Sequence, residues 1–301
     1  MNASSFIPPM VRGVSASRLY LPTIKPAPIS VFEYLCMQFS HITQQEWQQR
    51  FNDAQIYSET GEILTLHSPY IAHTQIFYYR FLEHEPHVPF KHHILFENDD
   101  LLVVDKPHFL TMSPTGQYVQ ETLLVRLKNE TGNELLTPIH RLDRETAGVV
   151  MFSKQAESRS LYQQLFAERK VQKTYFAIAP FCAELKFPLE MKVRMEKGNP
   201  FYTMKIVDGE PNSQTQIELT EHNDAWAIYK LDPHTGKQHQ LRLHLSSLGI
   251  PIKNDPFYPS LNHKDKDDFS APLQLLAKHL VFTDPVTKQK MHFSSRHELT
   301  L

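Results

Sequence analysis

From about residue 94 onward the chain alternates short apolar runs with polar turns, a pattern typical of strands interspersed with helices. Leu101–Val104 and Val149–Phe152 are unbroken apolar runs with the length and composition of strands buried on both faces. The pattern adds strands at 174–179, 217–219, 226–231, 273–282 and 290–293, a helix at 121–128, an amphipathic helix at 158–169 with Leu161, Leu165 and Phe166 inward, and an exposed loop at 261–271. This mixture predicts an α+β domain around a mixed, largely antiparallel central sheet with flanking helices.

The first 85 residues follow a different pattern. Prolines at 8, 9, 22, 26 and 28 indicate an extended arm, which we expect Leu19, Tyr20 and Leu21 to anchor. The pairs Ser30–Glu33 and Thr43–Glu46 are capping boxes and predict two short helices, followed by strand-like pieces at 56–57 and 63–66 around a Thr60–Gly61 turn. We therefore divide the chain into an arm (1–29), a small N-terminal α/β module (30–85) and, after a linker at 83–93, a catalytic domain (90–301).

Composition narrows the setting of this fold. The formal charge of −2 and a pI of about 6.8 give no global basic signal, so any polyanion would have to bind a local patch. The cysteines, Cys36 and Cys182, lie in apolar surroundings with no partner spacing, which indicates reduced thiols. No apolar run approaches the roughly 18 residues of a membrane span, and the N-terminus lacks the parts of a signal peptide. We expect a cytoplasmic protein without membrane contact.

The most informative stretch, Pro138–Lys154, places one carboxylate between two cations. Asp143 lies between Arg141 and Arg144, and in an extended chain Leu142 would face the core while its neighbours share the other side. A carboxylate flanked by cations stays ionised at neutral pH, which suits a nucleophile better than a proton donor. Taken alone, however, an Asp beside Arg is more often a turn residue or a structural ion pair.

A second informative stretch, residues 235–245, fits two local structures. Leu241, Leu243 and Leu245 alternate as in a strand, whereas Leu241, Leu245 and Leu248 with Gly249 beyond them are typical of a helix and its C-terminal stop. We favour a helix that starts just after Gly236. Arg242 would then lie beside the buried stripe, where its guanidinium could pair with Asp143 and aim the carboxylate.

Three stretches together resemble the motifs of the RluA-type pseudouridine synthases. They are His-Arg-Leu-Asp-Arg-Glu-Thr-Ala-Gly (140–148), Lys-Thr-Tyr (173–175) and Thr-Gly-Lys-Gln-His-Gln-Leu-Arg-Leu-His (235–244). The resemblance extends from about Ile94 to Phe293 and includes Leu102–Pro107 and Pro251–Tyr258. It implies a pseudouridine-synthase-like fold and the isomerisation of uridine to pseudouridine in a structured RNA, either ribosomal or transfer RNA.

The resemblance also implies roles for individual residues. Asp143 would be the nucleophile, Tyr175 would pack on the uracil and assist proton removal from its carbon-5, and Arg242 would pair with Asp143. RNA binding would fall to five further residues, with Arg141 filling the space left by the flipped nucleotide and Arg144 near phosphates: His140, Arg141, Arg144, Lys237 and His239. The reaction rearranges atoms within one nucleotide, so we expect no cofactor and no metal, RNA as the partner, and a monomer. The 17 histidines include no His-Glu-x-x-His, and there is no Cys-x-x-Cys.

Departures from the family pattern leave the RNA target open. Ala147 stands where the family usually has Ser, Lys237-Gln238 replaces Arg-Thr, and Lys253-Asn254 precedes Asp255 in place of Val-Gly. Residues 30–80 resemble the small RNA-binding module that precedes the catalytic domain in many relatives, although they lack a dense basic stripe.

Two alternative functions belong to other classes. A glycosidase could use Asp143 and Asp255 as paired carboxylates, and it would release a free base or sugar. A non-catalytic RNA-binding or RNA-chaperone protein could keep the fold, and its function would survive loss of the Asp143 carboxylate.

Overall fold

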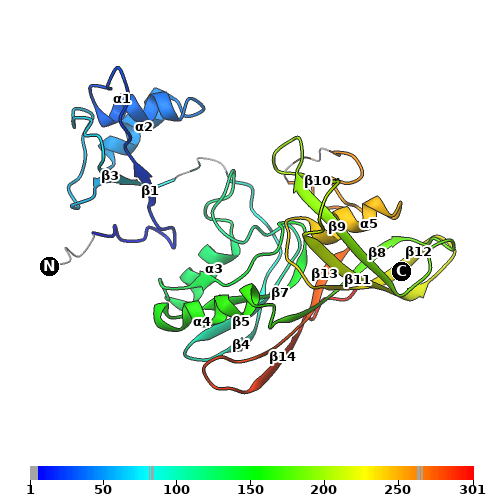
Figure 1. Ribbon diagram of the computed structural model, residues 1–301. Coiled ribbons are helices and arrows are strands. Elements are labelled where there is room, and N and C mark those ends of the chain that lie inside the picture. The colour runs from blue at the N-terminus through cyan, green and yellow to red at the C-terminus, as the bar shows by residue number, and fades with distance from the viewer. Residues whose placement is uncertain (1–5, 81, 83–84, 263–264, 266) are drawn as a thin grey trace. The chain divides into compact units, whose positions relative to one another are not determined.

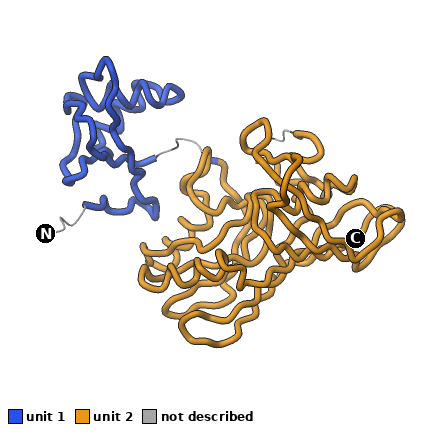
Figure 2. Tube along the Cα trace, in the orientation of Figure 1, with its two compact units in different colours: residues 1–85 blue, residues 86–301 orange. Residues whose placement is uncertain are grey.

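The computed structural model describes residues 6–80, 82, 85–262, 265 and 267–301. The chain forms two compact units, residues 1–85 and 86–301 (Figure 2). The 301-residue chain therefore holds a small N-terminal unit and a large C-terminal one.

The small unit packs two helices on a three-stranded antiparallel sheet. The sheet has the order β1 (Ser17–Tyr20), β3 (Gln75–Tyr78), β2 (Ile56–Ser58), and the helices are α1 (Val31–Gln38) and α2 (Gln44–Asn52). Its core joins all of these elements through fully buried apolar side chains, among them Leu21, Leu35, Trp47, Ile56 and Ile76. This core is separate from those of the large unit.

The local sequence signals of the small unit were partly right. The capping box at Thr43 and Glu46 is confirmed, whereas the carboxylate of Glu33 accepts the N–H of Ile29, so Ser30 caps its helix on one side only. The predicted hairpin at 56–66 is partly confirmed: a turn closes at Gly61, whose N–H donates to Ser58 O, and the Leu64 N–H donates to Ile56 O, but residues 63–66 form no strand. Strand β2 pairs with β3, and Ile63 makes an isolated bridge to Tyr57. Within the predicted arm, residues 17–20 form β1, which also pairs with β3.

The large unit is built on an 11-stranded sheet, drawn in Figure 1. The main path runs β10-β9-β11-β12-β8-β13-β7-β5-β4, with β14 beside β13 and β6 beside β7. Its strands are β4 (His93–Glu97), β5 (Leu101–Lys106), β6 (Thr137–Pro138), β7 (Ala147–Ser153), β8 (Gln172–Pro180), β9 (Leu189–Lys197), β10 (Met204–Val207), β11 (Ser213–His222), β12 (Trp226–Pro233), β13 (Leu275–Thr283) and β14 (Lys290–Ser294). The helices are α3 (Leu123–Thr131), α4 (Ala156–Ala167) and α5 (Gln240–Ser247). The pair β13–β7 is parallel and the other ladders are antiparallel, so the predicted mixed, largely antiparallel sheet is confirmed.

The unbroken apolar runs of β5 and β7 are explained by burial on both faces. Alternate side chains point to opposite sides of a strand. Leu102 and Val150 pack on the side of α3, whereas Leu101 and Met151 pack on the side of α4. A further core lies under α5, which packs Leu241 and Leu245 against β8, β11 and β12. The sheet thus has two halves, each with its own helix-covered core.

Gly148 lies where the two halves join. It begins the pairing of β7 with β13 opposite Ala277, and it has a φ of +123°. A Cβ at this position would collide with the backbone carbonyl of Ala277, so only glycine permits this approach. The segment before β7, which carries Asp143, is therefore held at the junction of the halves.

Several sequence predictions for the large unit need correction. Helix α4 buries Tyr162 and Leu165, whereas Leu161 is 41% exposed rather than inward, because α4 turns a different stripe toward the sheet. Strands β4, β9 and β10 were missed. The edge strands β4 and β10 are short, whereas β9 lies between β10 and β11 and alternates apolar and charged residues regularly, a strand pattern that the sequence interpretation overlooked. In the predicted 261–271 loop the described residues form neither helix nor strand, while residues 263, 264 and 266, like 83 and 84 of the predicted linker, lie outside the described residues. No helix in the part of the chain described here is long and apolar enough to cross a membrane.

Candidate active site

Asp143 begins a tight turn whose backbone is fixed by three donors. The N–H of Thr146 donates to the Asp143 carbonyl at 3.1 Å, which closes the turn. The next two carbonyls are held from strand β5 and the loop after it: Lys106 Nζ donates to Arg144 O at 3.1 Å, and His108 Nδ1 donates to Glu145 O at 2.6 Å. A backbone whose carbonyls are hydrogen-bonded in this way has little freedom to shift, so the Asp143 side chain extends from the turn in a fixed direction.

Lys106 and His108 are buried beneath the turn. Lys106 Nζ also donates to the carbonyls of Pro107 and Leu110, so three acceptors surround the amine. Burial lowers the pKa of Lys106 to about 7, against the opposing charges of Glu145 and Asp143. Burial also lowers the pKa of His108 to about 4, so its imidazole is neutral at pH 7 with the proton on Nδ1.

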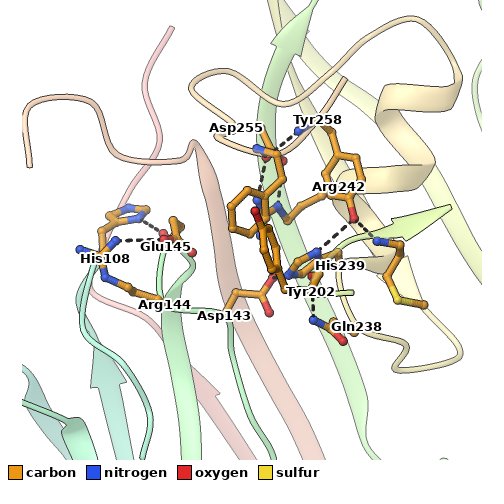
Figure 3. Close-up of polar contacts among 12 residues, drawn as sticks. His108, Asp143, Arg144, Glu145, Tyr202, Gln238, His239, Arg242, Asp255 and Tyr258 are labelled. Carbon is orange, nitrogen blue, oxygen red and sulfur yellow. Dashed lines mark hydrogen bonds and ion pairs between the residues drawn. The ribbon is translucent and has the colours of Figure 1, made fainter. Parts of the chain in front are cut away.

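Arg242, on the first turn of α5, connects two carboxylates (Figure 3). Its Nη1 lies 3.2 Å from Asp143 Oδ2, while its Nε and Nη2 make a bidentate pair with Asp255 at 2.8 and 2.7 Å. The guanidinium is 1% exposed, and Phe257 stacks on it at 4.7 Å. Burial acts to lower the pKa of Arg242, but the hydrogen bonds and charge of Asp255, with the charge of Asp143, raise it overall. The guanidinium is therefore a permanent cation aimed at Asp143.

His239 lies on the other side of the Asp143 carboxylate. It is the N-cap residue of α5 in a left-handed conformation, with Nε2 3.8 Å from Asp143 Oδ2 and Nδ1 3.1 Å from the Tyr258 hydroxyl. That hydroxyl accepts the N–H of Met204 at 2.8 Å, which leaves its own proton for His239 Nδ1. We therefore assign the imidazole proton to Nε2, facing Asp143. Burial lowers the pKa of His239, which keeps the ring neutral.

Tyr175 is a half-buried residue of β8 that packs against two of the large unit's cores, the one on the side of α3 and the one under α5. Its pKa is raised, mainly by burial and further by the charge of Asp143, so the phenol and the carboxylate are within electrostatic reach of each other. Lys173, two residues before it, donates from Nζ to Thr235 O at 3.3 Å and so ties β8 to the segment that precedes α5. The structure thus brings Asp143, Tyr175 and Arg242 together at the junction of the two halves.

The residues predicted to bind RNA fall into three groups. Arg141 and Lys237 are exposed. Arg144 lies over the rings of Phe109 and Tyr118 and bonds to Glu145. His140 is engaged within the fold: its ring stacks on Phe166 at 4.5 Å, its Nε2 accepts the Met151 N–H, and burial lowers its pKa to about 3. His239, described above, adjoins the carboxylate.

Three residues of the site were given no role in the sequence interpretation: Lys106, His108 and Tyr258. Asp255 was considered only as a carboxylate of the glycosidase alternative. Lys106 and Asp255 do stand in the family-like segments 102–107 and 251–258, which was the available signal. The helix predicted after Gly236 is confirmed, but it begins at Gln240, because the Gln240 side chain accepts hydrogen bonds from Thr235 and the Lys237 N–H. The glycosidase alternative loses its second carboxylate, since Arg242 and the N–H groups of Phe257 and Tyr258 occupy Asp255.

Comparison with known proteins places this site in a family. The family model described as RNA pseudouridylate synthase matches residues 100–247. The dual-specificity RNA pseudouridine synthase RluA of Pasteurella multocida is 31% identical over 218 residues, which cover 67% of this chain and 91% of that protein. The chain belongs to the RluA-type pseudouridine synthase family.

Other RluA-type relatives show how far the likeness extends. Pseudouridylate synthase RPUSD2 of Mus musculus is 31% identical over 214 residues, covering 65% of this chain. The chain spans about a third of the length of the mouse and human RPUSD2 proteins, 37% and 33%. The solved structure of human RNA Pseudouridylate Synthase Domain Containing 1 matches with a TM-score of 0.57 at 21% identity, over 71% of this chain and 86% of that one, and supports the fold.

The geometry limits the chemistry that the RluA-type site can perform. One partly exposed carboxylate is aimed by a buried cation, while the phenol of Tyr175 lies within electrostatic reach of it and a neutral N–H faces it. Such a carboxylate can attack a carbon centre as a nucleophile. Among the described residues, no group of three His, Cys, Asp or Glu side chains is placed to hold a metal ion.

Proposed function

We propose that the protein converts one or more specific uridines to pseudouridine in a structured RNA, ribosomal or transfer RNA, in the cytoplasm. The observation that carries the proposal is the ion pair at 3.2 Å between Arg242 and Asp143, a carboxylate that remains 29% exposed. Family membership supports the same reaction class. We propose that the enzyme acts as a monomer. We also propose that it needs no cofactor, because the reaction is an isomerisation within one nucleotide.

In the proposed reaction Asp143 attacks the flipped uridine at the ribose or the base. This attack forms a temporary C–O bond to Asp143, and the bond between uracil N1 and the ribose C1′ breaks. The uracil turns, a bond between C5 and C1′ forms, and the C–O bond to Asp143 breaks, which regenerates the carboxylate. The proton on C5 leaves and N1 gains one, so atoms and charge balance. Arg242 holds and aims the carboxylate, and Tyr175 packs against the uracil face near the departing C5 proton.

The free energy of RNA binding has to offset the cost of flipping the target uridine out of the stack. A base in a stacked RNA is out of reach, and flipping it out costs a few kcal/mol. We propose that Arg141 and Lys237, both exposed, contact the backbone or fill the vacated stack, with Arg144 near phosphates. His140 and His239 would then act on RNA indirectly, by shaping the loops that carry Arg141 and Lys237.

Release of tritium from RNA labelled at uracil C5 tests the proposal. We expect the wild-type chain to release tritium from unmodified ribosomal or transfer RNA, and Asp143→Asn to lower the rate at least about a thousandfold with RNA affinity nearly unchanged, because affinity comes mainly from phosphate contacts. Asp99→Asn, at an exposed position in the turn before β5, is the matched control and should retain full activity.

Two results would contradict the proposal. Failure of the wild-type chain to release tritium from every RNA class would defeat the isomerase assignment. Equal tritium release by Asp143→Asn and wild type would show that this carboxylate is not the nucleophile. If the proposal survives both tests, mapping pseudouridines in a deletion strain against its parent would identify the modified position.

A further inference from the structure

The hairpin formed by β9 and β10 exposes an aromatic side chain at its tip. Phe201 is 76% exposed. The tip is nevertheless closed: the Gly198 N–H donates to Thr203 O at 2.9 Å, and the N–H and hydroxyl of Thr203 donate to Pro200 O at 2.9 and 2.7 Å. A large apolar ring presented to water by an ordered turn requires an explanation.

Two hydrogen bonds tie this tip to the segments that form the candidate active site. Gln238 Nε2 donates to Tyr202 O at 3.1 Å, and the Met204 N–H donates to the Tyr258 hydroxyl at 2.8 Å. Gln238 is next to His239, and the Tyr258 hydroxyl bonds to the His239 ring. Figure 3 shows Tyr202 in the same cluster as His239 and Arg242. The tip is therefore an extension of the catalytic segments.

Aromatic rings connect the tip to the nucleophile in consecutive contacts. Phe201 and Tyr202 have centroids 5.6 Å apart, and Tyr202 and Phe257 are also 5.6 Å apart. Phe257 lies 5.3 Å from the ring of His239, whose Nε2 is 3.8 Å from Asp143. The outermost ring is the most exposed, so the series is open at one end and reaches the reacting carboxylate at the other.

We propose that Phe201 and Tyr202 form a stacking site for an unpaired nucleobase that neighbours the target uridine in the RNA. The proposal rests on the proposed function. Extrusion of one nucleotide removes a stacking partner from each neighbour, and an aromatic ring replaces that partner regardless of base identity. Exposed Lys197 and Lys237, at the end of β9 and beside Gln238, supply positive charge for the phosphates on either side.

A fluorescent base tests the stacking directly. The probe is a single-stranded oligouridylate nonamer with 2-aminopurine at its centre, because stacking on an aromatic ring quenches 2-aminopurine. We expect wild type and Phe201→Trp to quench the probe. Phe201→Leu, which keeps apolar bulk without a ring face, should lose the quench and bind the probe about tenfold more weakly, within the range for one stacked base. Leu161→Ala, at another exposed apolar position, is the control and should behave as wild type.

Further arms separate this proposal from the isomerase proposal. With a tritiated RNA substrate, Phe201→Leu should raise KM about tenfold and change kcat by less. Asp143→Asn should quench the probe as wild type does, although it releases no tritium. If the quench depends on Phe201 but no RNA is isomerised, the stacking site stands and the proposed function falls. Equal quenching and KM for Phe201→Leu and wild type would overturn the stacking site, as would equal competition by a duplex of the same length.

Discussion

Arg242 contacts two carboxylates, Asp143 in the turn before β7 and Asp255 in the loop after α5. The two differ in their exposure and in the number of hydrogen bonds they accept. Asp255 is fully buried and accepts two guanidinium N–H groups and two backbone N–H groups. Asp143 is 29% exposed and is reached by one guanidinium nitrogen at 3.2 Å, with the His239 ring farther away at 3.8 Å. The comparison suggests a division of labour: the saturated carboxylate fixes the cation, and the other keeps open oxygens with which to react.

Removing each carboxylate in turn gives the largest test of this comparison. Asp255→Asn should lower the free energy of unfolding by about 3 kcal/mol, because it leaves a buried guanidinium without its main counter-charge. Asp143→Asn should lower it by less than about 1 kcal/mol, since this carboxylate is partly solvated. Urea unfolding followed by circular dichroism measures both. Asp284→Asn, at a buried aspartate that pairs with Tyr162 and no cation, is a control that should leave tritium release intact. Equal destabilisation by the two substitutions would contradict the division of labour.

The backbone support of the Asp143 turn provides a second, smaller test. Lys106→Met keeps the volume but removes the donor to Arg144 O, so we expect about 2 kcal/mol of lost stability and about a tenfold lower kcat. RNA affinity measured by filter binding should not change. Lys278→Met is the matched variant, because Lys278 also donates to two backbone carbonyls, those of Ser295 and His297. It should lose stability and keep its kcat. An equal fall in kcat for both variants would show that loss of stability, and not loss of the donor to Arg144 O, lowers the rate.

The last test concerns pH, and it addresses the histidines with lowered pKa values rather than the guanidinium pairs. In the folded chain burial lowers the pKa of His108 and His244 to about 4 and that of His140 to about 3, whereas an unfolded histidine titrates near 6.5. Between these values the unfolded chain binds more protons, so stability falls as the pH falls from about 6.5 toward 4. Each group should contribute about 1 kcal/mol per pH unit in this window. Urea titrations at pH 7, 6 and 5 should show the loss, with a shallower slope for His244→Gln. A flat profile would contradict neutral burial of these rings.

The sequence predicted the large unit better than the small one, for physical reasons. Strands β5 and β7 are buried on both faces, so their apolar runs are continuous and visible without any partner. Strand β9 alternates charged residues with its apolar ones and the edge strand β10 has four residues including a lysine, so neither forms a continuous apolar run. In the small unit β2 makes the expected local contact with residues 63 and 64, but its strand partner is β3, about 20 residues away, which local spacing does not indicate.

The site was predicted where adjacent residues carry the signal and missed where distant ones do. The signals for Asp143 and Arg242 are each contained in one segment of the sequence. Asp143 is flanked by arginines, and Arg242 lies on a helix with periodic apolar residues. The roles of Lys106 and His108 depend on donation to carbonyls 37 or 38 residues later, and carbonyls leave no mark in a sequence. The bidentate partner of Arg242, Asp255, was visible as part of a family-like segment, but only the folded chain distinguishes it from Asp143.

The separation of Asp143 and Arg242 along the chain, 99 residues, has a consequence for how competence arises. Asp143, the proposed nucleophile, belongs to the half of the sheet with α3 and α4, and Arg242 belongs to the half with α5, so neither half alone holds the proposed catalytic pair. Because distant segments meet late, when most of the loop entropy has already been lost, a nascent or half-folded chain carries an unguided carboxylate. Only the fully folded protein therefore holds the pair of side chains that the proposed reaction on RNA requires.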